Sequence, residues 1–223
     1  MLILNFFCYN FSMIILFDLD GTLIDSTEAI LESFHNSFVI HGFKSVNDEE
    51  IKALIGHPLD IMYERLGVPK EKVWDFVTSY KERYREISRA KTKLLENAKE
   101  AVLLASEFAE IGIVTTKTGK YSKILMEHFE LMEYFKVLVG REDVENPKPH
   151  EEPILKALKS FDSSDRDIWM IGDTELDLLS AKNASVHSIA VLCGYGKKER
   201  LEKFTDLVFN DTYTAIKYLR SRK

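Results

Sequence analysis

The stretch "MIILFDLDGT", residues 13–22, sets an apolar run directly against two aspartates and a turn. Its first five residues are apolar and rich in branched side chains, which is typical of a buried strand in a parallel sheet. Asp18 and Asp20 follow two residues apart, although neighbouring carboxylates repel each other and favour water over apolar surroundings. Gly21 allows the backbone to turn at once. We therefore expect a cation and a ligand to compensate the charge where this strand ends.

From residue 92 onward the sequence alternates between short apolar runs and segments with helical spacing. Strands that alternate with helices predict right-handed βαβ units and a parallel sheet covered on both faces. The expected fold class is α/β, a doubly wound parallel sheet. The later strands are expected at 111–115, 136–140, 167–172, 187–192 and 206–209, and the helices at 96–110, 121–135, 153–161 and 175–184.

The block 29–91 shows helical spacing and no strand signal. We expect it to form an all-helical cap domain inserted into an α/β core made of 13–28 and 92–223. Residues 1–12 are interpreted as an N-terminal appendage, because Met13 begins a stretch that is sufficient as a first strand. The aromatic residues expected in the core of the cap are Phe34, Phe38, Trp74, Phe76 and Tyr80.

Polar side chains follow the expected strands at the points where they end. Thr115 and Thr116 close the second strand, Lys148 stands between two prolines after the third, and Asp173 and Asp177 follow the fourth. In an open α/β sheet, ligands bind beyond the carboxyl ends of the strands. These side chains are therefore expected to converge with Asp18 and Asp20 on one edge.

That set of side chains favours phosphoryl chemistry. Three close carboxylates need a compensating cation, and a hard cation with oxygen ligands, Mg²⁺, fits them best. Phosphate oxygens would occupy its open positions, with Thr115 and Lys148 holding the others. A carboxylate beside such a site can attack phosphorus and form an aspartyl-phosphate. A second carboxylate two residues on can protonate the leaving oxygen and then activate water.

Four stretches in order, "FDLDGT", "IVTTKT", "NPKPHEEP" and "MIGDTELD", resemble the haloacid dehalogenase superfamily on its phosphatase side. The resemblance covers residues 13 to about 215, and it places a helical cap where 29–91 lie. The segment "LIGHPLDIMYERLG" (54–67) is similar to the cap of phosphoglycolate-phosphatase-like members. Two features depart from the family pattern: Thr116 replaces a frequent Asn, and "KTKLLENAKEAV" (91–102) lacks the Pro-Gly that often precedes the next helix.

The resemblance implies a role for each matching residue. Asp18 would be the nucleophile and Asp20 the general acid/base, with a catalytic part for Thr115 and Lys148 as well. Binding of the phosphoryl group would fall to Thr115, Thr116 and Lys148. The metal would be held by Asp18, Asp173 and the backbone carbonyl of Asp20. Asp177 would support or ligate beside Asp173.

The resulting prediction is Mg²⁺-dependent hydrolysis of a small phosphate monoester, phosphoglycolate-like, through an aspartyl-phosphate. A sugar phosphomutase, a nucleotidase or a pyrophosphatase on the same core remain alternatives, and a non-catalytic binding protein is the alternative of another class. A dehalogenase would lack the second acid, so Asp20 argues against it. The sequence leaves open the physiological substrate, the cap residues that set specificity and the oligomeric state.

The composition of the chain limits the kinds of partner and the cellular location that we expect. The net charge of −6 argues against nucleic-acid binding, which usually needs a basic face. The apolar N-terminal residues lack a basic region and a cleavage site, and Asn5, Asn10 and Ser12 weaken a membrane span. The two cysteines form no CxxC pair, which fits a reducing cytoplasm. We expect a cytoplasmic enzyme whose partner is a small phosphorylated metabolite.

Three further features have two interpretations each. The stretch "GIVTTKTGKYS", which holds Lys117 and Lys120, is rejected as a phosphate-binding Gly-rich loop because its glycines are too far apart and Tyr121 replaces Ser or Thr. The basic segment 81–91 is interpreted as a solvated helix face with Glu partners, the alternative being an arginine that reaches the substrate. His57 is a candidate lining residue of the substrate pocket.

Overall fold

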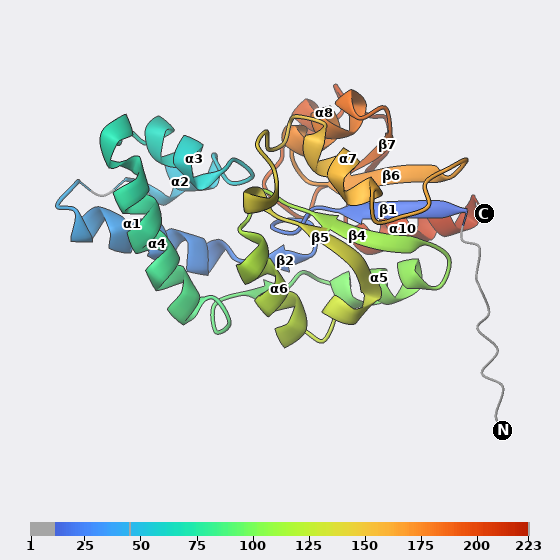
Figure 1. Cartoon of the computed structure of the whole chain (residues 1–223), viewed down its shortest axis with the longest axis horizontal. Helices are drawn as coiled ribbons and strands as arrows, with labels where there is room; N and C mark the ends of the chain where they lie inside the picture. Colours follow the sequence, from blue (N-terminus) through green and yellow to red (C-terminus); the bar gives the residue numbers. More distant parts are fainter. Residues whose placement is uncertain (1–11, 45, 223) are drawn as a thin grey trace.

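The computed structural model describes residues 12–44 and 46–222, so the expected appendage, apart from Ser12, lies outside the described residues. The core is a six-stranded parallel sheet (Figure 1). In spatial order its strands are β5 (Phe135–Val139), β4 (Glu110–Val114), β1 (Met13–Phe17), β6 (Asp167–Gly172), β7 (His187–Val191) and β8 (Val208–Phe209). The predicted doubly wound α/β class is confirmed.

Strand β1 lies at the centre of the sheet, where both of its faces are covered. Alternate residues face two different apolar clusters: Ile15 and Phe17 face one, and Ile14 and Leu16 face the other. A strand covered on both faces has no position for a polar residue, which explains its uninterrupted apolar sequence. The covering helices are α5 (Ala98–Ser106), α6 (Gly119–His128) and α10 (Thr212–Ser221) on one side, and α7 (Glu152–Leu158) and α8 (Glu175–Asn183) on the other (Figure 1).

The register of the central strands aligns their carboxyl ends. Phe17 is paired with Ile113 on β4 and with Ile171 on β6. The residues that follow these three strands therefore emerge at the same edge of the sheet. This edge carries Asp18, Thr115 and Asp173.

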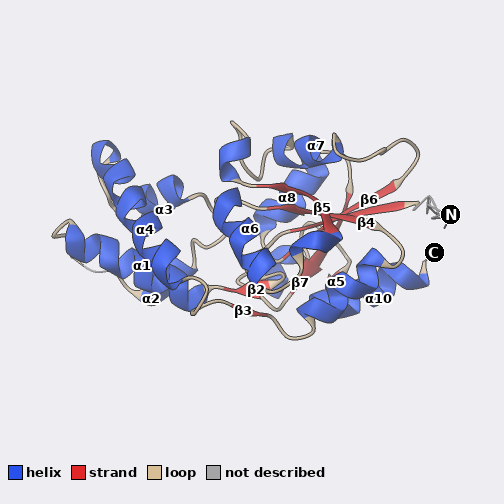
Figure 2. Cartoon of the chain, turned by 60° about the horizontal axis from the view of Figure 1, so that its bottom comes forward, coloured by secondary structure: helices blue, strands red, loops and turns tan. Residues whose placement is uncertain are grey.

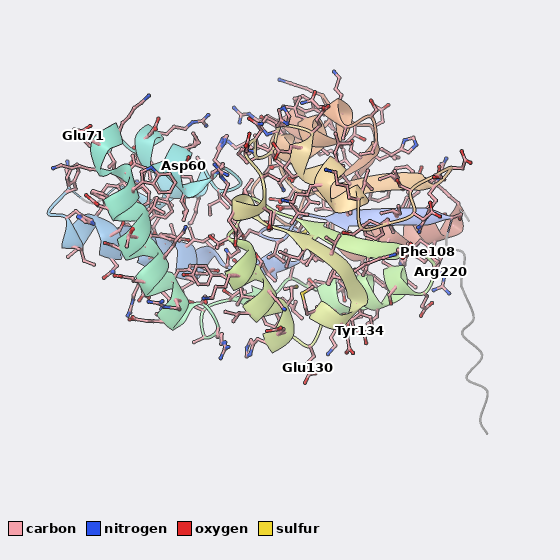
Figure 3. The ribbon with its side chains drawn as sticks, in the orientation of Figure 1. Asp60, Glu71, Phe108, Glu130, Tyr134 and Arg220 are labelled. Atoms are coloured by element: carbon pink, nitrogen blue, oxygen red, sulfur yellow. The ribbon has the colours of Figure 1, made fainter. Side chains whose placement is uncertain are left out.

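Helices α1 (Thr27–Ile40), α2 (Asp48–Lys52), α3 (Leu59–Arg65) and α4 (Val73–Ile87) form a separate body with its own apolar cluster. These helices make up the predicted all-helical cap. Figure 3 shows Asp60 and Glu71 on this body, with Phe108 and Arg220 at the opposite end of the core. The short antiparallel pair β2 (Ile24–Asp25) and β3 (Lys93–Leu94) ties together the two chain segments that lead to and from the cap (Figure 2). That pair was not predicted from the sequence.

The aromatic residues of the cap behave as predicted with one exception. Phe34, Phe38, Phe76 and Tyr80 are buried. Trp74 is 63% exposed, so its placement in the core was wrong. The buried stripe of α4 runs through Val73, Phe76, Val77, Tyr80, Tyr84 and Ile87 at helical spacing, and Trp74 lies off that stripe.

The helix and strand limits differ slightly from those predicted. The expected strand 111–115 ends at Val114, which leaves Thr115 beyond the sheet. The expected helix 121–135 ends at His128, and its last residues form a 3-10 turn and the start of β5. Helix α10 was not predicted, although Asp211 caps it by accepting a hydrogen bond from the backbone N–H of Thr214.

Among residues 12–44 and 46–222, no helix has both the length and the apolar character that crossing a bilayer requires.

The cap should depend on its aromatic cluster for stability. Phe34 is fully buried, and its ring lies 4.6 Å from that of Tyr63 and 5.0 Å from that of Tyr80. We expect Phe34→Ala to lower the free energy of unfolding by about 3–5 kcal/mol, measured by urea denaturation. Val39→Ala, at a 73% exposed position on the same helix, is the matched control, with a change within about 0.5 kcal/mol. Equal effects of the two substitutions would contradict the assignment of a separate packed core.

Candidate active site

Lys148 lies at the centre of the edge where the strands end. Its ammonium lies 2.7 Å from Oδ1 of Asp18, 2.5 Å from Oδ1 of Asp177 and 3.0 Å from the carbonyl oxygen of Val114. Lys148 is only 3% exposed. Burial lowers the pKa of this lysine, but the carboxylates of Asp177 and Asp18 more than offset that effect, so the pKa lies above its ordinary value. The ammonium is therefore charged and held by three oxygens.

Asp173 lies beside Asp18 in a closely fitted backbone cradle. Its Oδ1 accepts a hydrogen bond from the hydroxyl of Thr22 at 3.1 Å, and its Oδ2 accepts one from the backbone N–H of Tyr195 at 2.8 Å. Gly21 has φ +84°, and a side chain there would overlap the Asp173 carboxylate. The glycine after the second aspartate therefore serves both the turn and the approach of Asp173.

The side chain of Asp177 also lies in this group, beside Lys148. Its Oδ2 accepts hydrogen bonds from the backbone N–H and the hydroxyl of Thr174 at the start of α8, and its Oδ1 contacts Lys148. Asp177 is thus both a helix cap and a positioning partner of Lys148.

The three carboxylates form a cluster that fits a divalent cation. One oxygen each from Asp18, Asp173 and Asp177 lies within 4.8 Å of the other two, and all three residues are buried. If all three carboxyl groups were ionised beside the one ammonium of Lys148, the buried site would hold an excess of two negative charges. Burial raises the pKa of Asp18 to about 7 and that of Asp173 well above its ordinary value, further increased by the neighbouring carboxylates. Oxygen donors with excess negative charge match a hard divalent ion.

Asp20 lies at the same strand end, but its side chain faces the cap. The Lys117 ammonium lies 3.0 Å from each of its carboxylate oxygens, and the hydroxyl of Ser26 donates to Oδ1. The same ammonium lies 4.5 Å from the ring centre of Tyr84 on α4. Burial lowers the pKa of Lys117, but Asp20 and Tyr84 raise it above its ordinary value, so this lysine is charged.

The two predicted threonines have different surroundings. Thr115 is 4% exposed, and its hydroxyl accepts a hydrogen bond from the backbone N–H of Lys117 at 3.2 Å. The hydroxyl of Thr116 donates to the carbonyl oxygen of Gly56 in the cap at 2.8 Å. The side chain of Thr116 therefore connects core and cap, while its predicted contact with substrate stays a prediction.

A cavity of about 270 Å³ lies between cap and core, and Asp20 is one of its lining residues. Its lining includes His57, as predicted, together with the cations Lys81, Lys117 and Arg141. Within segment 81–91, Arg83 pairs with Glu86 on the same helix, which confirms the predicted internal Glu partner. The other pairs were not predicted: Arg83 also binds Glu32, and Lys91 binds Glu28 and Glu32, all on α1. The basic side chain of this segment that reaches the cavity belongs to Lys81 and not to an arginine.

Sequence reasoning missed Lys117 as a site residue. The sequence places it with Thr115 and Thr116 at the end of the expected strand, but it was given no role there, and the phosphate-binding loop that would include it was rejected. The signal available was position: Lys117 follows Thr115 by two residues, at the end of a strand next to β1.

Comparison with known proteins gives the family. The model of haloacid dehalogenase-like hydrolases matches residues 15–191. The PpaX protein of Caldanaerobacter subterraneus subsp. tengcongensis is 34% identical over 213 residues, which span 92% of this chain and 94% of the relative. The pyrophosphatase PpaX of Bacillus cereus is 31% identical over 207 residues, 87% of this chain and 94% of the relative. The chain belongs to the haloacid dehalogenase-like hydrolase family, as its four motifs predicted, and is a hydrolase of the phosphatase type.

Solved structures agree with this assignment. A predicted phosphatase from Clostridium acetobutylicum superposes with a TM-score of 0.84 at 26% identity, covering 95% of this chain and 99% of that one. A predicted phosphoglycolate phosphatase from Haemophilus somnus gives a TM-score of 0.84 at 21% identity, covering 94% and 98%, and shows that the fold is shared.

The charge excess predicts a pH-dependent response to Mg²⁺. Without a cation, the raised pKa of Asp18, about 7, means that its contribution to stability is full below about pH 4 and is lost as the pH rises through about 7. A divalent ion competes with that proton, so saturating Mg²⁺ should raise the unfolding temperature more at about pH 8 than at about pH 5.5. Differential scanning calorimetry with Mg²⁺ or a chelator measures the difference, and Asp173→Asn should reduce it. A larger shift at the lower pH would contradict this account of the cluster.

Proposed function

We propose that this protein is a Mg²⁺-dependent phosphatase that hydrolyses a small phosphorylated metabolite through an aspartyl-phosphate on Asp18. The observation that supports this most directly is the buried group of Asp18, Asp173 and Lys148 at the edge of the sheet, next to the cavity between cap and core. The cap, residues 29–91 in our proposal, would close over that cavity and exclude water.

In the proposed reaction, Asp18 attacks phosphorus. Lys148 binds Oδ1 of Asp18, so we assign the attack to Oδ2. As the new bond from Oδ2 to phosphorus forms, the bond from phosphorus to the leaving oxygen breaks, and that oxygen takes a proton from Asp20. Asp20 then takes a proton from water, whose oxygen attacks phosphorus while the bond from phosphorus to Oδ2 of Asp18 breaks. The products are the dephosphorylated metabolite and free phosphate, and Asp18 is regenerated.

Residues of this chain would hold the metal ion and the phosphoryl group. We assign Mg²⁺ to the carboxylates of Asp18 and Asp173 and the backbone carbonyl of Asp20. When bound, it would neutralise the buried carboxylates and the phosphoryl oxygens. We assign the binding of phosphoryl oxygens to Thr115 and Lys148, and Asp177 would keep the Lys148 ammonium in position. The predicted contact of Thr116 would come from its backbone, because its hydroxyl is engaged by Gly56.

Two compounds are the first candidates for the substrate. Phosphoglycolate follows from the motifs of the cap segment 54–67, and pyrophosphate follows from the name of PpaX relatives that are 34% and 31% identical over most of the chain. A phosphomutase would use the same core but return the phosphoryl group to the substrate, so release of free phosphate separates it from a phosphatase. We place the reaction in the cytoplasm, on a small metabolite and without a nucleic-acid partner.

The test is a screen of phosphorylated metabolites for phosphate release with and without Mg²⁺. We expect Mg²⁺-dependent release from at least one of phosphoglycolate and pyrophosphate. Asp18→Asn should reduce kcat by a factor of about 10⁴ or more, because the amide is a poor nucleophile and no phosphoenzyme forms.

Asp162→Asn is the matched control. Asp162 is exposed in the loop before β6, at the end of the sheet opposite the site, so its variant should retain wild-type turnover. Turnover that persists in Asp18→Asn would overturn the proposed nucleophile. A wild-type protein without Mg²⁺-dependent release from any phosphate would favour the non-catalytic alternative.

A further inference from the structure

Asp20 is fully engaged in the structure. Its Oδ1 accepts hydrogen bonds from Ser26 and Lys117, and its Oδ2 accepts one from Lys117. Because donors occupy both oxygens of Asp20, the leaving oxygen of a substrate can reach this carboxyl group only after Lys117 has moved. The general acid/base assigned above must therefore lose this partner before it can act.

The place of Lys117 shows where its ammonium can go. Lys117, Asp20 and Tyr84 all line the cavity between cap and core, and the ammonium lies over the Tyr84 ring at 4.5 Å. A phosphate attacked by Asp18 has its leaving group on the side of Asp20, so that group enters this cavity. The part of the substrate next to the leaving oxygen would then lie beside Lys117.

The surroundings keep the lysine charged and shield its pair with Asp20 from water. The side chain of Lys117 is only 9% exposed and that of Asp20 only 12%, so water competes weakly for the pair. Much of the cavity wall is apolar, including Ile30, Ile55 and Val77. A buried ammonium that leaves one carboxylate needs another anion.

We propose that Lys117 recognises a second anionic group on the leaving part of the substrate, and that its transfer from Asp20 to that group frees Asp20 to act as acid and base. This inference rests on the proposed function and specifies its substrate class. The substrate carries a carboxylate or phosphate within a few bonds of the transferred phosphoryl group. Pyrophosphate and phosphoglycolate share this chemistry, whereas a neutral alkyl phosphate lacks it.

A matched pair of substrates tests the transfer. Phosphoglycolate and ethyl phosphate differ mainly by a carboxylate in place of a methyl group, and pyrophosphate serves as a second anionic probe. With wild-type enzyme and Mg²⁺, we expect kcat/KM for phosphoglycolate or pyrophosphate to exceed that for ethyl phosphate by a factor of about 10 or more.

Lys117→Met keeps the length of the side chain and removes its charge. We expect kcat/KM for the anionic substrate to fall by a factor of about 10–100, because a charge-assisted hydrogen bond is lost. The value for ethyl phosphate should stay at its wild-type level or rise, since Asp20 no longer has to be released. Each comparison of Lys117→Met with the wild-type enzyme uses a single substrate, so the intrinsic reactivity of that substrate cancels.

Lys120→Met is the control, because Lys120 is exposed on the next helix and does not line the cavity. It should leave both values unchanged.

Equal losses on both substrates in Lys117→Met would show a structural role and overturn the proposal. If that variant does not fold, a wild-type enzyme that hydrolyses ethyl phosphate as well as the anionic substrates overturns it equally. Failure of the proposed function is distinct: the wild-type enzyme would then release phosphate from none of the three.

Discussion

A buried excess of negative charge at the carboxyl edge of the sheet is the constraint that organises this protein. One oxygen each of Asp18, Asp173 and Asp177 lies within 4.8 Å of the other two, and the ammonium of Lys148 contacts Asp18 and Asp177. Such a cluster is costly without further compensation. The surrounding backbone is fitted to it, since Gly21 has no room for a side chain against Asp173 and Asp177 doubles as the cap of α8.

Asp20 connects this cluster to the cap. It is only two residues from Asp18, yet its carboxylate faces the cavity and pairs with Lys117, which in turn touches Tyr84 of α4. A second connection runs from Thr116 to Gly56. The acidic cluster at the edge of the sheet and the cavity under the cap are therefore joined through a few polar contacts.

Much of this arrangement could be predicted because it follows from local sequence. The strand Met13–Phe17 matched to the residue, since a strand buried on both faces has an unbroken apolar sequence, and the strand ends predicted the edge where Asp18, Asp173 and Lys148 meet. The pairing of Asp20 with Lys117 joins residues 97 positions apart, and no local pattern encodes it. Trp74 was misplaced because apolar character alone does not give its side of the helix.

The most direct test of the central claim is the number of protons released when Mg²⁺ binds. Isothermal titration calorimetry at about pH 6.5, in buffers with different enthalpies of ionisation, gives that number. If the cation replaces protons on the buried carboxylates, wild-type protein should release roughly one to two protons per bound ion, and Asp173→Asn should bind far more weakly. Mg²⁺ binding without proton release and with equal affinity in Asp173→Asn would contradict the claim that this cluster holds the metal.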